Sequence, residues 1–351
     1  MSTRESLRAV VAVPLSEEHC RLIERLEPRL DLVRDASLTH PMRGPADWSG
    51  DPAHRRSPDE QRAFEAMVDS AEALFGIPDV DPAALARTVA ANTSLRWVMT
   101  TAAGGGGQVK AADLDRSALD RIAFTTSAGV HGGPLAEFTV FGVLAGAKDL
   151  PRLARQQKEA VWSDRWEMRQ IDEMTVLVVG LGGIGAECAR RFRALGAEVW
   201  GTTRSGAPVE GVDRLVQLDD LVAAVAEVDA IVVTLPGTDQ THHLIGAEIL
   251  AAVKPGAIVV SVGRGTVIDE RELLSALDDG RVSFAALDVF EVEPLPSESP
   301  LWRHPNVLMS PHTAALSSKE EERIARRFAE NATRLLDGAP LRAVVDTVEF
   351  Y

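Results

Sequence analysis

The second half of this 351-residue sequence places anion-binding and proton-carrying side chains directly after short apolar runs. The polar residues that follow these runs are Arg264, Asp288, Glu291, Glu293 and His312. The guanidinium of Arg264 is planar and suits bidentate binding of a carboxylate, and the imidazole of His312 can donate a proton near neutral pH. Because the carboxyl ends of parallel strands line the ligand crevice of an open sheet, these residues form a coherent candidate site.

Each of these residues also has an ordinary structural interpretation. A histidine after a strand is more often a satisfied loop residue than a catalyst, and Glu293 precedes a proline and suits a solvated turn. Arg264 can serve as a structural ion-pair partner, although an arginine is rarely buried alone because its charge is costly to desolvate. Gly263 and Gly265, on either side of it, indicate a backbone conformation that other residues avoid.

A glycine-rich turn supplies the signal for a cofactor. The sequence GLGGIG at 180–185 follows the apolar run 176–179 and precedes a helix-like segment. In this pattern Gly180 permits a tight turn, Gly182 lets the backbone approach a pyrophosphate, and Gly185 lets the helix pack on the strand. The exposed N–H groups and the positive end of the helix then hold the diphosphate. Since both the strand and the helix are clear, the pattern predicts a dinucleotide site rather than an ordinary turn.

The end of the following strand indicates which dinucleotide is preferred. NAD-preferring sites place Asp or Glu about 20 residues after the glycines, where it accepts a hydrogen bond from the ribose. This sequence has Thr203, Arg204 and Ser205 there and no carboxylate. Arg204 can pair with a 2′-phosphate, and both hydroxyls can donate to it, so we expect NADP(H) to be favoured over NAD(H). The alternative is a solvated surface arginine.

Short β-branched runs alternate with helix-period segments, which is typical of parallel α/β sheets. The predicted strands are 9–13, 30–33, 73–75, 95–99, 122–125, 175–179, 197–201, 230–235, 257–262, 284–287 and 307–310. The predicted helices include 16–26, 81–91, 134–147, 151–162 and 318–336, the last with Ile324, Phe328, Ala332 and Leu335 on one apolar stripe. Residues 41–60, rich in Pro, Gly, Asp and Arg, are expected to form an exposed loop. The simplest arrangement is two α/β domains with parallel sheets and a cleft between them.

Composition and charge exclude several classes of partner. The formal net charge of −15 argues against nucleic acid and anionic membranes, because no broad face can neutralise phosphates. Cys20 and Cys188 are far apart and show no metal-ligand spacing, so neither a disulfide framework nor a metal site is expected. No signal peptide and no apolar run near the ~20 residues of a membrane span is present, which favours a cytoplasmic protein.

The sequence resembles the D-isomer-specific 2-hydroxyacid dehydrogenases, which include glyoxylate/hydroxypyruvate reductases and phosphoglycerate dehydrogenases. The resemblance runs from about Ala128 to Ala315 and rests on GLGGIG, LPGTDQTHHLIG, VGRGTVIDERELLSAL, ALDVFEVEPLP and SPLWRHPNVLMSPHTAA. It implies a Rossmann-like NAD(P)-binding domain at 129–315 and a flavodoxin-like substrate domain at 1–128 plus 316–351.

The resemblance also implies a reaction, the reduction of a 2-oxo acid by NAD(P)H to a D-2-hydroxyacid. Arg264 would bind the substrate carboxylate, His312 would act as general acid, and Glu293 would orient its ring and favour the protonated form. The implied cofactor contacts are Gly180, Gly182, Gly183, Ile184 and Gly185 at the diphosphate, Thr203, Arg204 and Ser205 at the adenosine ribose, Leu235, Pro236 and Thr241 at the adenine half, Val262, Gly263 and Asp288 near the nicotinamide amide, and Ala314 with His312 beside the ring.

The glycine run at 104–107 falls where the family places a substrate loop. The N–H groups of Gly104 and Gly105 would bind the substrate carboxylate opposite Arg264, and a flexible loop without this role is the alternative. A homodimer is expected by analogy through residues 136–162, and His131 is expected to be structural.

Two functions stay open. The first is an NADP(H)-leaning 2-oxoacid reductase whose partner is a small 2-oxo or 2-hydroxy acid of unspecified side chain. The second is a dinucleotide-sensing binding protein similar to the family's transcriptional corepressors, which keep the same three residues and act through protein contacts. Formate dehydrogenase is disfavoured because that branch has glutamine in the role of Glu293.

Overall fold

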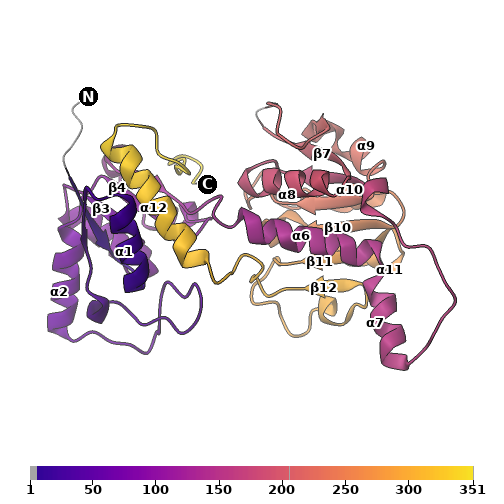
Figure 1. Cartoon of the computed structure of the whole chain (residues 1–351), viewed down its shortest axis with the longest axis horizontal. Coiled ribbons are helices and arrows are strands. Elements are labelled where there is room, and N and C mark those ends of the chain that lie inside the picture. The colour runs from indigo at the N-terminus through magenta and orange to yellow at the C-terminus, as the bar shows by residue number, and fades with distance from the viewer. Residues whose placement is uncertain (1–5, 205, 351) are drawn as a thin grey trace. The chain divides into compact units, whose positions relative to one another are not determined.

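The computed structural model describes residues 6–204 and 206–350, and the chain in it divides into two compact units. Unit 1 contains the chain up to His131 and from Leu316 onward, and unit 2 is Gly132–Ala315. Each unit has its own parallel sheet with helices on both faces (Figure 1). The expected α/β fold with two parallel sheets is therefore confirmed.

Unit 1 is built on a five-stranded sheet in the order β2-β1-β3-β4-β5, with every neighbouring pair parallel. The strands are β1 (Leu7–Val11), β2 (Leu30–Val33), β3 (Ala73–Phe75), β4 (Trp97–Met99) and β5 (Ala123–Thr125). This order is that of flavodoxin-like sheets, in which the winding direction reverses between β1 and β3.

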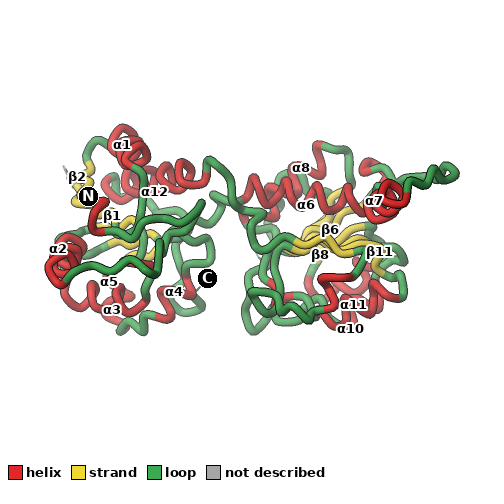
Figure 2. The backbone as a smooth tube through the Cα atoms, turned by 90° about the horizontal axis from the view of Figure 1, so that it is seen from below, coloured by secondary structure: helices red, strands yellow, loops and turns green. Residues whose placement is uncertain are grey.

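Helices cover both faces of this sheet (Figure 2). The helices of unit 1 are α1 (Glu17–Leu26), α2 (Pro58–Asp69), α3 (Pro82–Ala91), α4 (Gly106–Ala111), α5 (Arg116–Arg121) and α12 (Glu320–Leu336). The predicted apolar stripe of α12 is confirmed, because Ile324, Phe328 and Ala332 are fully buried in the core that α12 shares with α1. The ring of Phe328 stacks on Trp97 of β4 at 4.6 Å. Helix α12 is thereby packed onto the sheet of unit 1.

Unit 2 contains a seven-stranded parallel sheet in the order β12-β11-β10-β9-β6-β7-β8. The strands are β6 (Thr175–Val179), β7 (Glu198–Thr202), β8 (Arg214–Val216), β9 (Ala230–Val233), β10 (Ala257–Ser261), β11 (Val282–Leu287) and β12 (Val307–Met309). β6 pairs with both β7 and β9, so the strand order reverses there, as in the doubly wound dinucleotide-binding fold. The central strands are predominantly apolar because helices cover both of their faces.

Helices pack on the two faces of this second sheet (Figure 2). The helices of unit 2 are α6 (Gly132–Ala147), α7 (Leu150–Glu159), α8 (Gly183–Ala194), α9 (Leu221–Val225), α10 (Ala247–Ala252) and α11 (Glu270–Asp278). One core cluster joins the sheet to α6 and α8, and the other joins it to α9, α10 and α11. Among residues 6–204 and 206–350, every helix is too short or too polar to cross a lipid bilayer.

Three local predictions were wrong. The loop expected at 41–60 ends earlier, because α2 begins at Pro58 with a capping box between Ser57 and Glu60. The short edge strand β8 was not predicted, since its sequence Arg-Leu-Val contains no apolar run. Helix α7 ends at Glu159 rather than at Trp162, whose side chain is fully exposed.

Candidate active site and cofactor site

The glycine turn after β6 has the geometry of a diphosphate site. Gly180 has a φ of +105°, which glycine adopts at little cost. A β-carbon at Gly185 would lie 2.0 Å from the carbonyl oxygen of Gly180, so only glycine allows α8 to pack this closely on the turn. A β-carbon at Gly182 would meet no chain atom within 4 Å and would project into open space. The geometry therefore fits the predicted roles of the three glycines. Gly180 forms the tight turn, Gly182 leaves room for a pyrophosphate to approach the backbone, and Gly185 lets the helix pack on the strand.

The first turn of α8 offers backbone donors to an anion. Gly182 caps the helix without a side-chain hydrogen bond, and its first turn contains no acidic residue. Since the first N–H groups of a helix lack intrahelical acceptors and carry the positive end of its dipole, this terminus suits a phosphate group. The residues present thus fit a dinucleotide, which would be held by Gly182, Gly183 and Ile184.

The glycine turn is fastened to the end of β7. The N–H of Gly180 donates to Thr202 Oγ1 at 3.0 Å, and the N–H of Leu181 donates to the Thr202 carbonyl at 2.8 Å. Thr203 and Arg204 follow directly, with Arg204 exposed at the carboxyl edge of the sheet. Ser205, which was predicted beside them, lies outside the described residues.

Arg264 follows β10 between two glycines that close backbone contacts require. A β-carbon at Gly263 would lie 2.4 Å from the carbonyl oxygen of Leu235, and one at Gly265 would lie 1.9 Å from the carbonyl carbon of Phe290. Neither glycine has a positive φ, so the unusual conformation expected from the sequence is not observed. The two glycines are required because neighbouring strand-end turns press against the backbone on both sides of Arg264.

The Arg264 side chain is exposed and donates to the carbonyl oxygen of Gly263 at 2.8 Å. Within the described part of the chain it forms no ion pair, which argues against the structural interpretation of this arginine. Its guanidinium retains donors in a planar fork that suits a carboxylate.

His312 and Glu293 form a hydrogen-bonded pair. The imidazole Nδ1 lies 2.7 Å from Glu293 Oε2, while Glu293 Oε1 accepts the Phe290 N–H at 2.9 Å. Both oxygens of the carboxylate are thus engaged, which fixes its direction. With Nδ1 facing the carboxylate, Nε2 is the nitrogen left to exchange a proton with a substrate. The imidazole is about half exposed, at 45% of the side chain.

Asp288 holds the turn that presents His312. Its Oδ1 accepts the N–H groups of Thr313 and Ala314, both at 3.0 Å, and its carbonyl accepts the His312 N–H at 2.9 Å. His312 has a φ of +53°, which is uncommon for a residue with a side chain. Burial raises the pKa of Asp288, and the hydrogen bonds it accepts oppose that effect. The structure therefore shows that Asp288 supports this turn. Its contact with the nicotinamide amide, which the resemblance implied, stays a prediction.

The remaining residues predicted for unit 2 lie on the same edge of the sheet. Leu235 follows β9 and packs its side chain against Gly180, and Thr241 donates to the Pro236 carbonyl at 2.7 Å. Val262 is buried at the end of β10. The turns after β6, β9, β10, β11 and β12 therefore bring together most of the residues that sequence reasoning selected.

Gly104 and Gly105 belong to unit 1, where they follow β4. A β-carbon at Gly105 would lie 1.8 Å from Thr100 Oγ1, so the chain is tightly packed at this point. Gly106 and Gly107 already form the start of α4. The run is thus a turn that leads into a helix. The role of its N–H groups in binding a substrate stays a prediction.

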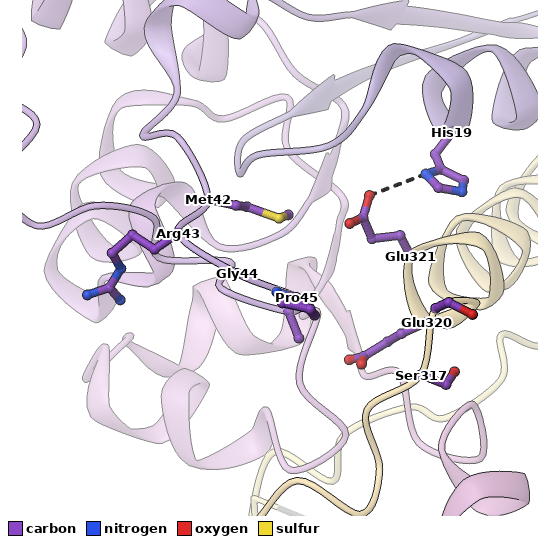
Figure 3. A pocket seen from close by; sticks show the side chains of 10 residues that line it. His19, Met42, Arg43, Gly44, Pro45, Ser317, Glu320 and Glu321 are labelled. Carbon is purple, nitrogen blue, oxygen red and sulfur yellow. Dashed lines mark ion pairs between the residues drawn. The ribbon is translucent and has the colours of Figure 1, made fainter.

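A cavity of about 400 Å³ lies within unit 1 (Figure 3). Its lining residues are His19, Met42, Arg43, Gly44, Pro45, Ala46, Ser317, Ser318, Glu320 and Glu321. His19 Nδ1 pairs with Glu321 at 3.3 Å, and Glu320 is buried with an oxygen 3.1 Å from His131 Nε2. This contact gives His131 the structural role expected of it. The predicted site residues all lie elsewhere.

The fold and the glycine turn of unit 2 define a dinucleotide-binding protein, and its strand-end residues add an Arg–Glu–His set. The model for the D-isomer specific 2-hydroxyacid dehydrogenase NAD binding domain matches residues 140–314. Glyoxylate/hydroxypyruvate reductase B of Yersinia enterocolitica is 34% identical over 265 residues, covering 67% of this chain and 80% of that protein. Glyoxylate/hydroxypyruvate reductase A of Salmonella choleraesuis is 35% identical over 222 residues, covering 63% and 70% respectively.

Two solved structures are similar to this chain over nearly its whole length. A D-isomer specific 2-hydroxyacid dehydrogenase from Xanthobacter autotrophicus, solved with NADPH and MES, has a TM-score of 0.75 at 31% identity and covers 99% of this chain and 100% of its own. A family protein from Aeromonas salmonicida has a TM-score of 0.74 at 31% identity and the same coverage. The chain belongs to the D-isomer specific 2-hydroxyacid dehydrogenase family and is an NAD(P)-dependent oxidoreductase.

Proposed function

We propose that this protein reduces short 2-oxo acids such as glyoxylate and hydroxypyruvate, with NADPH preferred over NADH. The observation that supports this most directly is the 2.7 Å contact between His312 Nδ1 and Glu293 Oε2. A carboxylate in this position stabilises an imidazolium and leaves its second N–H directed outward as a proton donor.

Each residue has a defined part in this reaction. The guanidinium of Arg264 binds the substrate carboxylate through paired hydrogen bonds and orients the adjacent carbonyl. His312 Nε2 donates its proton to the carbonyl oxygen as that oxygen gains charge, and Glu293 stabilises the ring while it is protonated. A nicotinamide dinucleotide held at the glycine turn by Gly182, Gly183 and Ile184 would supply the hydride for the carbonyl carbon. In the reverse direction His312 Nε2 accepts the hydroxyl proton.

The N–H groups at Gly104 and Gly105 are proposed to take part in binding the substrate carboxylate from unit 1. The support is local: the turn follows β4 at the carboxyl edge of that sheet, the edge at which parallel sheets bind ligands. On this basis unit 1 is the substrate domain and unit 2 is the cofactor domain.

The preference for NADPH rests on the end of β7. No carboxylate follows Thr202 until Glu210, so nothing at Thr203 or Arg204 repels a 2′-phosphate. Arg204 is exposed there and can reach one. The NADPH held by the Xanthobacter relative is consistent with this preference.

A homodimer is proposed through α6, α7 and the segment that follows. Phe141, Val161 and Trp162 are exposed there, Trp162 completely, and burying such large apolar side chains would favour association. Light scattering behind size exclusion measures the oligomeric state directly, and a Trp162→Asp variant that stays dimeric would place the interface elsewhere.

A substrate panel tests the proposed function. The purified protein is assayed for oxidation of NADPH and NADH with glyoxylate, hydroxypyruvate and a bulkier 2-oxo acid, and the configuration of glycerate formed from hydroxypyruvate is determined. We expect turnover, a lower KM for NADPH and the D-product. Cofactor binding without turnover of any 2-oxo acid would support the alternative, a dinucleotide-sensing binding protein.

A further inference from the structure

Two glutamates beside the proton-carrying pair hold each other through reciprocal hydrogen bonds. The N–H of Glu270 donates to Glu291 Oε1 at 2.8 Å, and the N–H of Glu291 donates to Glu270 Oε1 at 2.7 Å. We refer to Glu270 and Glu291 as the glutamate clasp. Sequence reasoning noted Glu291 only as one polar residue after a strand, and it gave Glu270 no role.

The clasp joins two strand-end turns that carry the proposed machinery. Glu270 is the first residue of α11, in the segment that follows β10 and Arg264. Glu291 lies in the loop that follows β11, two residues before Glu293. β10 and β11 are neighbours in the sheet, so the clasp spans the carboxyl ends of adjacent strands.

Each half of the clasp satisfies a backbone donor that has few alternatives. The N–H of Glu270 is in the first turn of a helix and has no intrahelical acceptor, while the Asp269 cap already binds the N–H groups of Arg271 and Glu272. The carboxylate of Glu291 therefore acts as a second cap at α11, where the helix dipole favours negative charge. The reciprocal bond from Glu270 fixes the backbone of Glu291 in return.

His243, in the turn that follows β9, lies beside the clasp. Its backbone N–H donates to the Thr266 carbonyl at 2.8 Å. Its Nε2 lies 3.3 Å from Glu291 Oε1, although without hydrogen-bond geometry, and its Nδ1 lies 3.6 Å from Asp269. α10 begins only at Ala247, so His243 belongs to the turn that precedes this helix. His243 places a group that can be protonated against an otherwise acidic cluster.

The clasp is positioned to determine the direction of Glu293. The loop is fastened at Glu291 by the clasp and at Phe290 by close packing against Gly265. Only the exposed Val292 separates the clasp from Glu293 along the chain. Glu293 Oε1 in turn accepts a hydrogen bond from the Phe290 N–H. Releasing Glu291 therefore frees the backbone that aims the carboxylate at His312.

We propose that Glu270 and Glu291 are positioning residues that hold Glu293 against His312 through their hydrogen bonds rather than through their charge. The importance of this position for turnover rests on the function proposed above, whereas its effect on the titration of His312 does not. Besides His312 and Glu293 themselves, this part of unit 2 contains five charged or titratable groups that the proposal must consider. They are Asp288, Glu270, Glu291, Asp269 and His243. Burial raises the pKa of Glu270, the hydrogen bond from the Glu291 N–H opposes that effect, and the charges of Glu291 and Glu293 add to it.

Two substitutions at each glutamate of the clasp separate the effect of side-chain length from the effect of charge. Glu270→Gln and Glu291→Gln remove the charge but keep an oxygen at the same distance, while Glu270→Asp and Glu291→Asp keep the charge and shorten the reach by one methylene. Glu272→Gln and Glu272→Asp are matched controls, because Glu272 is in the same first turn of α11 and pairs with Arg271 outside the clasp.

Three measurements are made on every variant: the titration of the His312 ring by NMR, kcat for 2-oxo acid reduction across pH, and the dissociation constant for NADPH. We expect the Asp variants to move the midpoint of the His312 titration to lower pH and to lower kcat roughly 10-fold, because Glu293 is misplaced by a fraction of an ångström to about 1 Å. The Gln and control variants are expected to match the wild type, and cofactor binding is expected to be unchanged throughout.

The outcomes separate the proposal from its alternatives. Asp variants that match the wild type would overturn the proposal, and a loss in the Gln variants alone would assign the effect to charge. If an Asp variant fails to bind cofactor, the proposal is tested with the Gln variants alone. A lower pH midpoint of the His312 titration in the Gln variants would contradict positioning by hydrogen bonds. If the wild type reduces no 2-oxo acid, the proposed function fails, while the NMR titration still tests the clasp.

Discussion

A β-carbon placed on Gly265 would lie 1.9 Å from the carbonyl carbon of Phe290, so the turn after Arg264 is packed directly on the loop that leads to Glu293. Phe290 also donates its N–H to Glu293 at 2.9 Å. The proposed anion-binding group and the proton-carrying pair are thus parts of one packed assembly. Because packed interiors transmit strain, substitutions on either side are expected to affect both.

Replacing His312 with alanine removes the proposed proton donor. We expect kcat for 2-oxo acid reduction to fall by roughly 10²–10⁴, the range attributed to general acid catalysis, while NADPH still binds. Steady-state kinetics and cofactor titration measure the two effects separately. His242→Ala is a matched control, since His242 is an exposed histidine of the same unit. Near-normal turnover in His312→Ala would reject the proton-donor role.

Glu293→Gln keeps the shape of the side chain and removes the counter-charge of the imidazolium. An opposite charge in contact favours the protonated ring, so its loss lets the ring give up its proton at lower pH. Reduction requires the protonated ring, and the decline of kcat/KM with rising pH is therefore expected to begin at lower pH than in the wild type. An unchanged pH profile would mean that Glu293 only orients the ring. Glu298→Gln, in an exposed loop, is the control.

Arg264→Ala removes the proposed carboxylate-binding group. We expect KM for the 2-oxo acid to rise roughly 100-fold, since a paired charge-assisted contact is worth a few kcal/mol, and kcat to fall because orientation is lost. Arg264→Lys is expected to recover only part of the loss, as an ammonium lacks the planar fork. The exposed Arg271→Ala serves as control. An unchanged KM would exclude carboxylate binding by Arg264.

Arg204→Ala tests the cofactor preference. If the guanidinium binds the 2′-phosphate, the dissociation constant for NADPH is expected to rise about 10-fold, as for one charge-assisted contact at an exposed site, while that for NADH stays constant. Fluorescence titration with both dinucleotides measures this difference. Arg193→Ala on α8 is a control that removes another exposed arginine from the same unit. Equal affinities of the wild type for NADPH and NADH would contradict the preference.

Glu27 is expected to make unit 1 sensitive to acid. Hydrogen bonds from Arg29 lower the pKa of this buried carboxyl from 4.5 to about 2, and Thr333 of α12 adds a further bond. A depressed folded-state pKa contributes stability above the unfolded value, which is lost as pH falls from 4.5 toward 2. Glu27→Gln is expected to lower the free energy of unfolding by about 2–3 kcal/mol near neutral pH.

Urea unfolding across this pH range measures the effect of Glu27→Gln. The difference from the wild type is expected to shrink as the pH approaches 2, because the wild-type carboxyl then becomes protonated as well. Glu18→Gln, on the exposed face of α1, provides the comparison. A difference that stays constant down to this pH would show that the charge of Glu27 contributes nothing.

The sequence predicted elements with strong local signals. β2, β3 and β6 have the bounds expected of them, because β3 and β6 are largely apolar runs and β2 alternates apolar residues with one exposed aspartate. Helix α2 was missed although its capping residues Ser57 and Glu60 were present, since the composition around it resembles a loop. β8 was missed because pairing with β7, rather than its own three residues, makes it a strand.

The residue types of the candidate site could be predicted from the sequence, but the contacts that hold these residues in place could not. The positions of Arg264, Glu293 and His312 after predicted strands indicated a candidate site, and the resemblance to the family implied their roles. The need for Gly263 and Gly265 was attributed to local conformation, whereas it comes from Leu235 and Phe290 on other turns. Contacts between turns depend on sheet order and register, which periodicity does not specify.

The two thiols are inaccessible to ordinary cysteine chemistry. Cys20 and Cys188 are buried, and desolvation raises the pKa of each to about 11. At pH 8 only about one thiol in a thousand is then ionised, and the thiolate is the reactive form. The native chain is therefore a suitable background for maleimide labelling, in which a single engineered cysteine on each unit would report their separation by energy transfer without first removing any natural residue.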